Sequence, residues 1–420
     1  MPALANAYIT VYESPDPQRI YAYTPGLVRL PSGRLVATMD QGGPGVHDLL
    51  GPKGLRGEGS GAWQGLIFSS DDRGQTWTRR AAFPFMHARP FLAGRSLYVL
   101  GHAGDLTVVR SDDDGETWSS PAQLTHDQAW HQSACNVHYA NDKVYLAMER
   151  RARQTHHSWP VSDLAPVLMS APVDADLTRS ESWTFASELV IGDHVQEVDW
   201  LGVPFWPLGA LTPEDAHDRR HMAPIGWLET NVVQFLDPDH AWYDPEGRSF
   251  YLWMRAHTGA TNLACIARVI EDEDGAMHTT FATSPAGVRL LYVPCPGGHM
   301  RFHILYDEVT RLYWLLSSLS TDSMTRPDRL PPVRYNLPNN ERHILALHVS
   351  RNCLDWCLAG VVAHGSSSQQ ARHYASMCFD GDDLHVLSRS GDHRAHSAHD
   401  GNLITFHTVE RFRDLVYPFY

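Results

Sequence analysis

The chain is patterned almost throughout as short apolar runs of strand length, separated by clusters of Gly, Pro, Asn and Asp. Runs such as Gly65–Phe68 and Leu106–Val109 are typical of β-strands. The apolar spacing of an amphipathic helix is nearly absent. The pattern therefore predicts an all-β protein made of many short strands.

Two of these runs are followed by the same motif, S-x-D-x-G-x-T-W, at Ser70–Trp77 and again at Ser111–Trp118. The copies begin 41 residues apart, which is the length of a four-stranded propeller blade. Within the motif, Asp and Gly favour a tight turn between two strands, and the Ser and Asp side chains can bond backbone amides inside it. The Trp is expected to pack between neighbouring sheets. Degenerate copies follow at 170–183 and 350–356.

The repeat, together with the opening segment Tyr23–Gly33, resembles the Asp-box (BNR) sialidase-like β-propeller superfamily. The resemblance covers nearly the whole chain and implies a single propeller domain over residues 1–420, acting on a sugar chain at the mouth of its central channel. Six blades are expected. Their inner strands should begin near Thr24, His87, His131, His240, His299 and Arg372.

The ends of the chain are expected to close the ring, with Tyr8–Tyr12 as the outer strand beside a third strand at Leu403–His407. The segment Ile191–Thr230 is rich in Pro, Trp and Asp and fits no blade. We expect it to be an insertion over one face; a seventh blade within it is the alternative.

Composition narrows the function classes. The 420 residues carry a net charge of −14, which disfavours general binding to nucleic acid or to an anionic membrane surface. No apolar run is long enough to span a bilayer. The start does not resemble a signal peptide, so the expected location is the cytoplasm, or outside the cell with the export signal missing from this sequence. The sequence leaves the oligomeric state open.

Histidine is unusually frequent, with 25 copies. In a propeller, the loop that leads into each inner strand and the loop that leaves the second strand open on the same face. Most of the His, Arg and Tyr residues that are candidates for catalysis or substrate binding lie in these two classes of loop. The candidate catalytic residues are His87, His102, Arg150, His373 and Tyr374. The candidate substrate-binding residues are Tyr23, Arg89, His131, Arg255, His257, His299, Arg301, Arg372 and Arg389.

These residue types suit a sugar that carries an acidic group. Arginine binds a carboxylate in a planar, two-pronged fashion, and His and Tyr transfer protons. The first hypothesis is a lyase that eliminates at a uronic acid within an oligo- or polysaccharide, with arginine neutralising the carboxylate. The alternatives are an exo-glycoside hydrolase, either a rhamnosidase or sialidase-like, and a propeller that binds glycans or proteins without catalysis. No cofactor is predicted; His299 and His303 leave only a structural metal ion open.

One departure from the family pattern bears on the sialidase alternative. Sialidases typically begin with Tyr-Arg-Ile-Pro, whose arginine holds the substrate carboxylate, whereas this chain reads Ala22-Tyr23-Thr24-Pro25. A sialidase is therefore disfavoured. A channel mouth rich in His and Arg but lacking that arginine is closer in character to the rhamnose–glucuronate lyases, other propeller polysaccharide lyases and related rhamnosidases.

Overall fold

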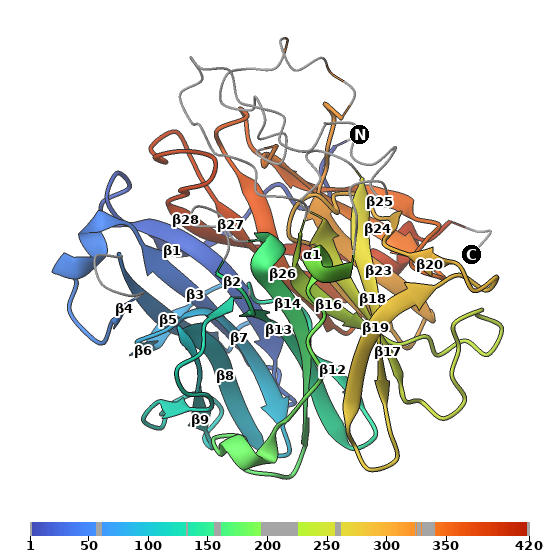
Figure 1. Cartoon of the computed structure of the whole chain (residues 1–420). Helices are drawn as coiled ribbons and strands as arrows, with labels where there is room; N and C mark the ends of the chain where they lie inside the picture. Colours follow the sequence, from blue (N-terminus) through green and yellow to red (C-terminus); the bar gives the residue numbers. More distant parts are fainter. Residues whose placement is uncertain are drawn as a thin grey trace.

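Six antiparallel sheets stand around a common centre in this computed structural model (Figure 1). The structure describes residues 2–55, 61–131, 133–154, 161–194, 226–256, 262–323, 325, 329 and 341–417. Its helical segments are short: α1 (Ile191–His194) and the 3-10 turns Pro44–Asp48, Val161–Asp163, Ser180–Ser182 and Phe412–Leu415. The predicted all-β, six-bladed propeller is confirmed.

Each sheet is one blade, numbered here in chain order from the innermost strand outward. Blade 1 consists of β2 (Tyr21–Arg29), β3 (Leu35–Gly42), β5 (Ala62–Ser70) and β6 (Thr78–Phe83), with β4 (Gly54–Leu55) paired to β5. Blade 2 consists of β7 (Met86–Ala93), β8 (Ser96–Ala103), β9 (Asp105–Ser111) and β10 (Ala122–Gln123). In blade 3, β11 (Trp130–His131) and β12 (His138–Ala140) both pair with β13 (Lys143–Arg151), followed by β14 (Leu164–Pro172) and β15 (Thr184–Phe185).

The second half of the chain repeats this plan. Blade 4 consists of β16 (Trp227–Val233), β17 (Ser249–Ala256), β18 (Leu263–Glu271), β19 (Met277–Thr283) and β20 (Arg289–Leu290), with β21 (Tyr292–Pro294) paired to β18. Blade 5 consists of β22 (His303–Asp307), β23 (Leu312–Ser318), β24 (Ile344–Ser350) and β25 (Cys357–His364). Blade 6 consists of β26 (Arg372–Asp380), β27 (Asp383–Ser390), β28 (Leu403–Val409) and β1 (Ile9–Glu13).

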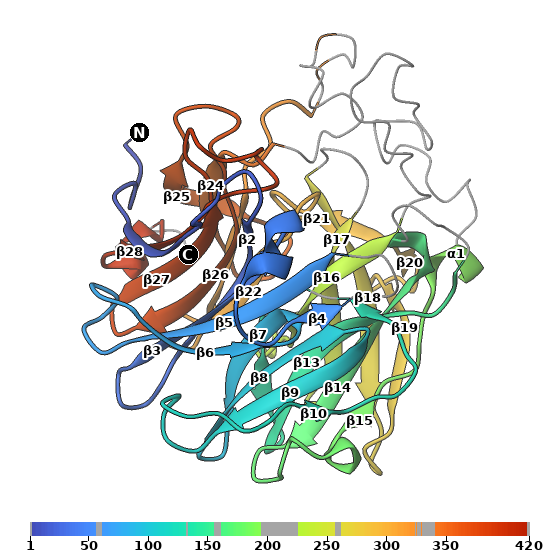
Figure 2. The same cartoon turned by 90° about the vertical axis from the view of Figure 1, so that its left-hand side faces the viewer.

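The two ends of the chain meet in blade 6, as predicted. Strand β1 pairs antiparallel with β28, so the first strand in the sequence is the outer strand of the last blade. Blades 6 and 1 then stand side by side (Figure 2). This pairing closes the ring and leaves no open sheet between its ends.

The fourth blade begins earlier than predicted. Its inner strand is β16, so the end of the segment 191–230 belongs to a blade. His240 lies in the connection between β16 and β17, where its ring stacks on Phe235 at 3.8 Å. The polar residues Glu229, Thr230 and Asn231 hid this strand from a search for apolar runs. Residues 195–225 lie outside the described residues.

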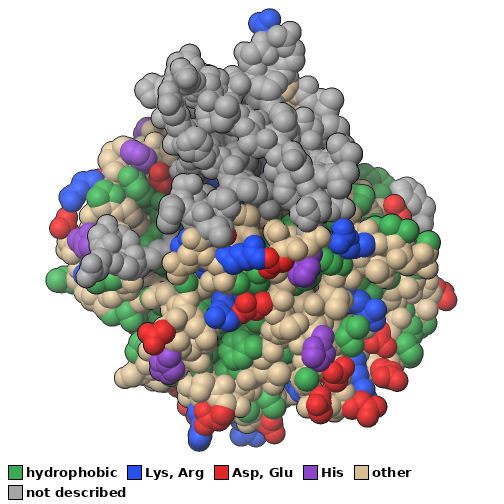
Figure 3. Space-filling model, viewed as in Figure 1, with side chains coloured by type: hydrophobic (Ala, Val, Ile, Leu, Met, Phe, Trp, Pro, Cys, Tyr) green, Lys and Arg blue, Asp and Glu red, His purple; other side chains and the backbone are tan. Residues whose placement is uncertain are grey.

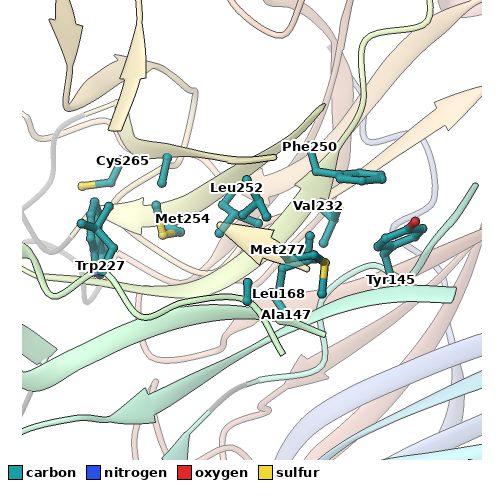
Figure 4. Close-up of a cluster of buried hydrophobic side chains, with 14 of the residues drawn as sticks. Tyr145, Ala147, Leu168, Trp227, Val232, Phe250, Leu252, Met254, Cys265 and Met277 are labelled. Atoms are coloured by element: carbon teal, nitrogen blue, oxygen red, sulfur yellow. The ribbon is translucent and has the colours of Figure 1, made fainter. Parts of the chain in front are cut away.

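Apolar side chains fill the spaces between neighbouring blades. Between blades 3 and 4, Tyr145 and Leu168 pack with Trp227, Phe250 and Leu252 (Figure 4). Because each blade twists relative to the next, large side chains are needed to fill the outer part of each wedge. This packing fixes the angle between blades and therefore the position of every strand end around the channel.

The two motif turns have the same hydrogen bonds. Asp72 accepts bonds from the Thr76 amide at 2.9 Å and hydroxyl at 2.6 Å, and Asp113 accepts the equivalent bonds from Thr117 at the same distances. Trp77 packs edge-on against Phe406 of blade 6, with ring centroids 5.4 Å apart. The turn chemistry and the packing between sheets are thus as expected from the sequence.

Four inner strands share a β-bulge close to their first residues. The register shifts occur at Tyr23/Gly26, Met86/Arg89, Leu228/Asn231 and His373/Ser376. Each bulge contains a non-glycine residue with positive φ: Thr24 at 37°, His87 at 56°, Glu229 at 58° and Tyr374 at 49°. A bulge re-aims a side chain that regular pairing would direct between the sheets. Four blades therefore have the same kind of β-bulge at the same end of the channel.

The two motif glycines provide a matched test of this packing. Gly74 and Gly115 have φ of 86° and 85°, so alanine strains both backbones, by about 1 kcal/mol. A Cβ at Gly74 would lie 2.1 Å from Phe406, whereas one at Gly115 would meet Leu97 at an ordinary 3.4 Å. We expect Gly74→Ala to lower the free energy of unfolding by a further ~1–3 kcal/mol, as overpacking does. Equal losses in denaturant unfolding of the two variants would contradict the packing of blade 1 on blade 6.

Candidate active site

The starts of the inner strands and the ends of the second strands lie at the same end of the channel. Strand register shows this directly, because Tyr23 pairs with Asp40, Met86 with His102, His131 with Glu149, Leu228 with Arg255 and His373 with Arg389. The motif turns close the opposite end of the strands. The predicted convergence of these two loop classes on one face is therefore present.

A buried phenol forms the centre of this face. The Tyr374 hydroxyl donates to Glu229 Oε1 at 2.6 Å and accepts from an Arg255 guanidinium nitrogen at 2.8 Å. Arg255 also lies 3.3 Å from Glu229 Oε2 and donates to the His299 carbonyl at 2.8 Å. Glu229 and Tyr374 come from blades 4 and 6, and each stands at the left-handed position of its bulge. The two bulges thus bring a base and a hydroxyl together across the channel.

Two further guanidiniums face the same phenol. The Arg342 guanidinium lies 5.5 Å from the centre of the Tyr374 ring, and that of Arg389 lies 5.3 Å from it. Arg389 also lies 4.1 Å over the ring of Tyr23. The sequence has no arginine at Tyr23, but β27 places the Arg389 guanidinium over the Tyr23 ring.

Burial dominates the electrostatics of these groups. It raises the pKa of the Tyr374 phenol, and Glu229 adds to the rise while Arg255 and Arg342 oppose it. It lowers the pKa of Arg342 to about 10 and also lowers that of Arg389. At neutral pH Tyr374 therefore keeps its proton, and the guanidiniums stay charged. Three guanidiniums lie around Tyr374 and Glu229, and Asp400 is a second carboxylate beside Arg389, so cations outnumber carboxylates at the site.

A cluster of imidazoles lies on the other side of the mouth. His87 Nδ1 is 3.1 Å from His102 Nε2, and the ring of His131 is 5.3 Å from that of His87. The buried Asp40 accepts a bond from the His87 amide at 2.8 Å and so holds the bulge in place. His87 is half-buried, whereas His102 and His131 are buried. Of the three rings, that of His87 is the most accessible from the mouth.

A row of rings joins the two groups. Trp63 lies 5.2 Å from Tyr23 and 6.0 Å from His87, measured between ring centroids. On the other side of the mouth, the Ser133 hydroxyl, two residues after His131, lies 3.4 Å from Glu229. Side chains thus line the mouth from Tyr374 through Arg389 and Tyr23 to the imidazoles, and return to Glu229.

Tyr23 is held from outside the mouth. Its hydroxyl donates to Asp400 at 2.5 Å, and His399 Nδ1 lies 2.6 Å from the same carboxylate oxygen. Arg389 donates to the His399 carbonyl. The segment before β28 therefore fixes both the phenol and the guanidinium that lies over it.

Several candidate residues have partners elsewhere. Arg150 forms an ion pair with Glu188 and is 40% exposed, which directs it away from Tyr374. Arg372 bonds the carbonyls of Ala371 and Gly391, and its guanidinium lies 5.0 Å from the Tyr8 ring. Both lie at the rim, because alternate residues of a strand point to opposite faces.

Other candidates lie beneath the site. Arg89 and Arg301 are almost fully buried; Arg89 donates to the Ala147 carbonyl of β13 and Arg301 to the Ala375 carbonyl of β26. His373 is buried with Nδ1 3.0 Å from Arg342, so it positions that arginine. His299 is buried and contributes its carbonyl to Arg255. His257 lies outside the described residues.

The sequence did not lead us to Glu229, Arg342 or Trp63; it did indicate that the segment ending at Asp400 borders the pocket, without giving Asp400 a role. Glu229 lay in the segment assigned to an insertion, and Arg342 precedes the third strand of its blade, in a loop class that the search did not include. Trp63, in the third strand of blade 1, belongs to the same omitted class. One signal for Glu229 was present in the sequence. The polar residues Glu229, Thr230 and Asn231 interrupt an otherwise apolar strand, as expected where a bulge lies near the start of an inner strand.

The acidic surface and the basic site are separate. Figure 3 shows charges of both signs spread over one face, with Asp and Glu gathered at its lower right. A surface hollow of about 690 Å³ is lined by Asp244, Glu246, Glu271, Asp272, Glu273 and Asp274 with two arginines. Within the described ranges no three His, Cys, Asp or Glu side chains are grouped to hold a metal ion. None of the described helices is long and apolar enough to cross a bilayer.

Asp40 provides a pH test of the site. Burial raises the pKa of its carboxyl to about 8, against ~3.9 in an unfolded chain. Between those values the unfolded chain loses the proton and the folded chain keeps it, so the folded state loses stability as pH rises. We expect Asp40→Asn, measured against the parent by thermal unfolding, to gain in relative stability from pH 4.5 to pH 8.

Asp400→Asn should show the opposite trend. Although burial alone would raise it, the pKa of Asp400 is held well below its usual range by the bonds from His399 and Tyr23. The stabilisation that its charge contributes is present above the unfolded pKa and is lost as the pH falls. Asp400→Asn should therefore lower the stability of the folded protein at pH 7, and the loss of stability should become smaller towards pH 3. Parallel trends for the two variants would contradict these assignments.

Comparison with known proteins yields fold relatives only. No protein-family model matches the chain, and no curated protein matches it. A protein of unknown function from Dyadobacter fermentans matches with a TM-score of 0.54 and 13% identity, covering 96% of this chain and 97% of that one. The Hadza microbial sialidase Hz136 matches with a TM-score of 0.56 and 15% identity, covering 97% of this chain and 69% of that one. The Penicillium chrysogenum α-L-arabinanase, solved with arabinobiose, matches with a TM-score of 0.50 and 11% identity, covering 98% of this chain and 99% of that one. The chain therefore shares the β-propeller fold of these proteins.

Proposed function

We propose that this protein is a glycoside hydrolase in which Tyr374 is the nucleophile and Glu229 its base, acting on a sugar that carries a carboxylate. One observation carries the proposal: the Tyr374 hydroxyl lies 2.6 Å from a buried carboxylate and 2.8 Å from a buried guanidinium. A hydroxyl within hydrogen-bond reach of a base that a third group orients is the arrangement of an activated nucleophile. Sialidases are the glycosidases known to use a tyrosine in this role.

The charges around Tyr374 indicate the substrate. Arg255, Arg342 and Arg389 give the site more positive charge than Glu229 offsets, and guanidiniums bind carboxylates in a planar, two-pronged fashion. Because Arg255 touches the nucleophilic oxygen, a carboxylate bound to it would lie close to the carbon under attack. This favours a sugar whose acid group is attached to the anomeric carbon.

A phenol suits such a substrate better than a carboxylate nucleophile. A carboxylate would meet the substrate's own negative charge at short range, in a site where burial leaves little screening. Tyr374 approaches uncharged and transfers its proton to Glu229 as the new bond to carbon forms. Glu229 becomes neutral in this step, and the electron pair of the broken glycosidic bond leaves on the departing oxygen, which needs a proton from a general acid. Water then releases the sugar with its original anomeric configuration.

The absence of an arginine at Tyr23 does not weigh against a sialidase-like hydrolase, because Arg389 lies 4.1 Å over the Tyr23 ring and faces Tyr374. The lyase hypothesis assigned roles to Arg150 and His373, which have partners away from the mouth or below it. The Tyr374–Glu229 pair therefore supports the hydrolase alternative over a lyase.

His87 is the group we assign to protonate the leaving oxygen. Asp40 and Glu149 are fully buried, and Asp400 is bonded by Tyr23 and His399. The half-buried His87 lies across the mouth from Tyr374, joined to it through Trp63, Tyr23 and Arg389. To protonate that oxygen, His87 acts as the imidazolium: its Nδ1–H donates to His102 Nε2, and its Nε2–H proton goes to the leaving oxygen, which leaves a neutral ring.

Tyr374→Phe tests the nucleophile. It should reduce hydrolysis of an aryl glycoside of a carboxylate-bearing ketose by at least about 10³-fold, as should Glu229→Gln. Tyr313→Phe is the matched control, because Tyr313 is also buried and donates to a backbone carbonyl, that of Gln234, away from the site. Full activity of Tyr374→Phe would exclude this mechanism. An unsaturated product with strong ultraviolet absorbance would instead establish the lyase.

His87→Asn tests the proton donor. Loss of acid catalysis is severe when the leaving group is a sugar and small when it is a good one such as 4-nitrophenol. We expect kcat/KM for an oligosaccharide to fall about 10²–10³-fold while the aryl substrate loses far less. Tyr374→Phe should lose both equally. Equal losses on the two substrates in His87→Asn would assign the imidazole to binding instead.

A further inference from the structure

The central channel contains a second polar site, one layer below the active site. A cavity of about 240 Å³ lies among the inner strands, lined by Gly26, Arg89, Asn136, His303, Ser376 and mostly apolar neighbours; Arg29, which is paired with Asp380, also lines it. Arg89 and Ser376 follow His87 and Tyr374 by two residues, about 7 Å along each strand. A cavity this large holds several waters or a small ion, because one water occupies ~30 Å³.

A buried guanidinium, that of Arg89, lines this cavity, and a second one, that of Arg301, lies behind the lining residue Ser376. Arg89 and Arg301 are each 1% exposed, and neither forms an ion pair within the described part of the chain. The bonds of Arg89 to carbonyls are long, at 3.1 to 3.4 Å, and Arg301 donates to the Ala375 carbonyl and the Ser376 hydroxyl. The Nε of each guanidinium has no acceptor. Buried charges normally have a partner of opposite sign, so two such groups together indicate a missing anion.

The other polar groups near this pair are also donors. His303 accepts a bond on Nδ1 from the Met377 amide at 2.9 Å, so its neutral ring carries the proton on Nε2. The Asn136 amide nitrogen is already bonded to two carbonyls. No carboxylate lines the cavity among the described residues. A lining of cations and N–H donors without acidic groups suits an anion and repels a cation.

We infer that the channel cavity binds a small monovalent anion of the halide class, between the Arg89 side chain and His303. Much of the lining is apolar, from Leu27, Phe91, Leu305 and Met377, which favours a weakly hydrated halide over phosphate or sulfate. The anion would compensate Arg89 and Arg301 and brace the inner strands that carry Tyr374 and His87. The inference stands on these buried charges alone and is independent of the proposed hydrolase activity.

Thermal unfolding of the whole chain in different salts tests the site. At equal ionic strength, chloride and bromide should raise the unfolding temperature by about 2 °C or more over gluconate, saturating with concentration as for a single bound ligand. Arg89→Met should abolish the halide-specific increment. Arg372→Met is the matched control, since Arg372 is also buried and bonds carbonyls, but at the rim; it should keep the increment.

A bromide-soaked crystal of the unaltered protein gives the second measurement. An anomalous peak in the cavity beside Arg89 is expected, and it decides the matter even if Arg89→Met fails to fold. An empty or water-filled cavity, no halide-specific shift in the parent, or a shift that persists in Arg89→Met would each overturn the inference.

Discussion

The candidate site depends on one backbone device, the β-bulge near the start of the inner strands. At Thr24, His87, Glu229 and Tyr374 a non-glycine residue adopts a left-handed conformation that costs about 1–3 kcal/mol. Such a conformation persists only where its surroundings hold it, and here they do: Asp40 bonds the His87 amide, and Glu229 and Tyr374 bond each other. Bulges in different blades thus place a base, a hydroxyl and an imidazole around one channel. The propeller supplies the positions, and the bulges direct the side chains.

The architecture was readable from the sequence because its signals are local. The two S-x-D-x-G-x-T-W turns carry their own hydrogen bonds, and the pairing of β1 with β28 follows from counting strands. Strand order also predicted which loops converge, so Tyr23, His87, His102, Arg255, Tyr374 and Arg389 were expected at one mouth and are found there. Local pattern and repeat length sufficed for these inferences.

What the sequence could not show depends on side-chain direction. Arg150 and Arg255 occupy similar places at the ends of second strands, yet one pairs with Glu188 at the rim and the other reaches Tyr374. Which way each points depends on twist and on neighbours distant in sequence. The place of Arg389 is of the same kind, because this guanidinium comes from β27 and lies over the ring of Tyr23 on another strand. Aligning a motif by sequence position shows that an arginine is absent at Tyr23, but it does not show that Arg389 of another strand lies beside it.

Ring closure has a consequence for how the chain reaches this structure. Strand β1 precedes all the other strands and its partner β28 follows them, so blade 6 cannot be completed until synthesis has passed β28. Blades 1 to 5 can pair their strands as they emerge from the ribosome, but Tyr374 and Arg389 belong to the last blade. The side chains of the candidate site at the channel mouth therefore come together last. Long-range pairing of this kind is slow, and the exposed edge of β28 is a hazard for aggregation until the first strand docks.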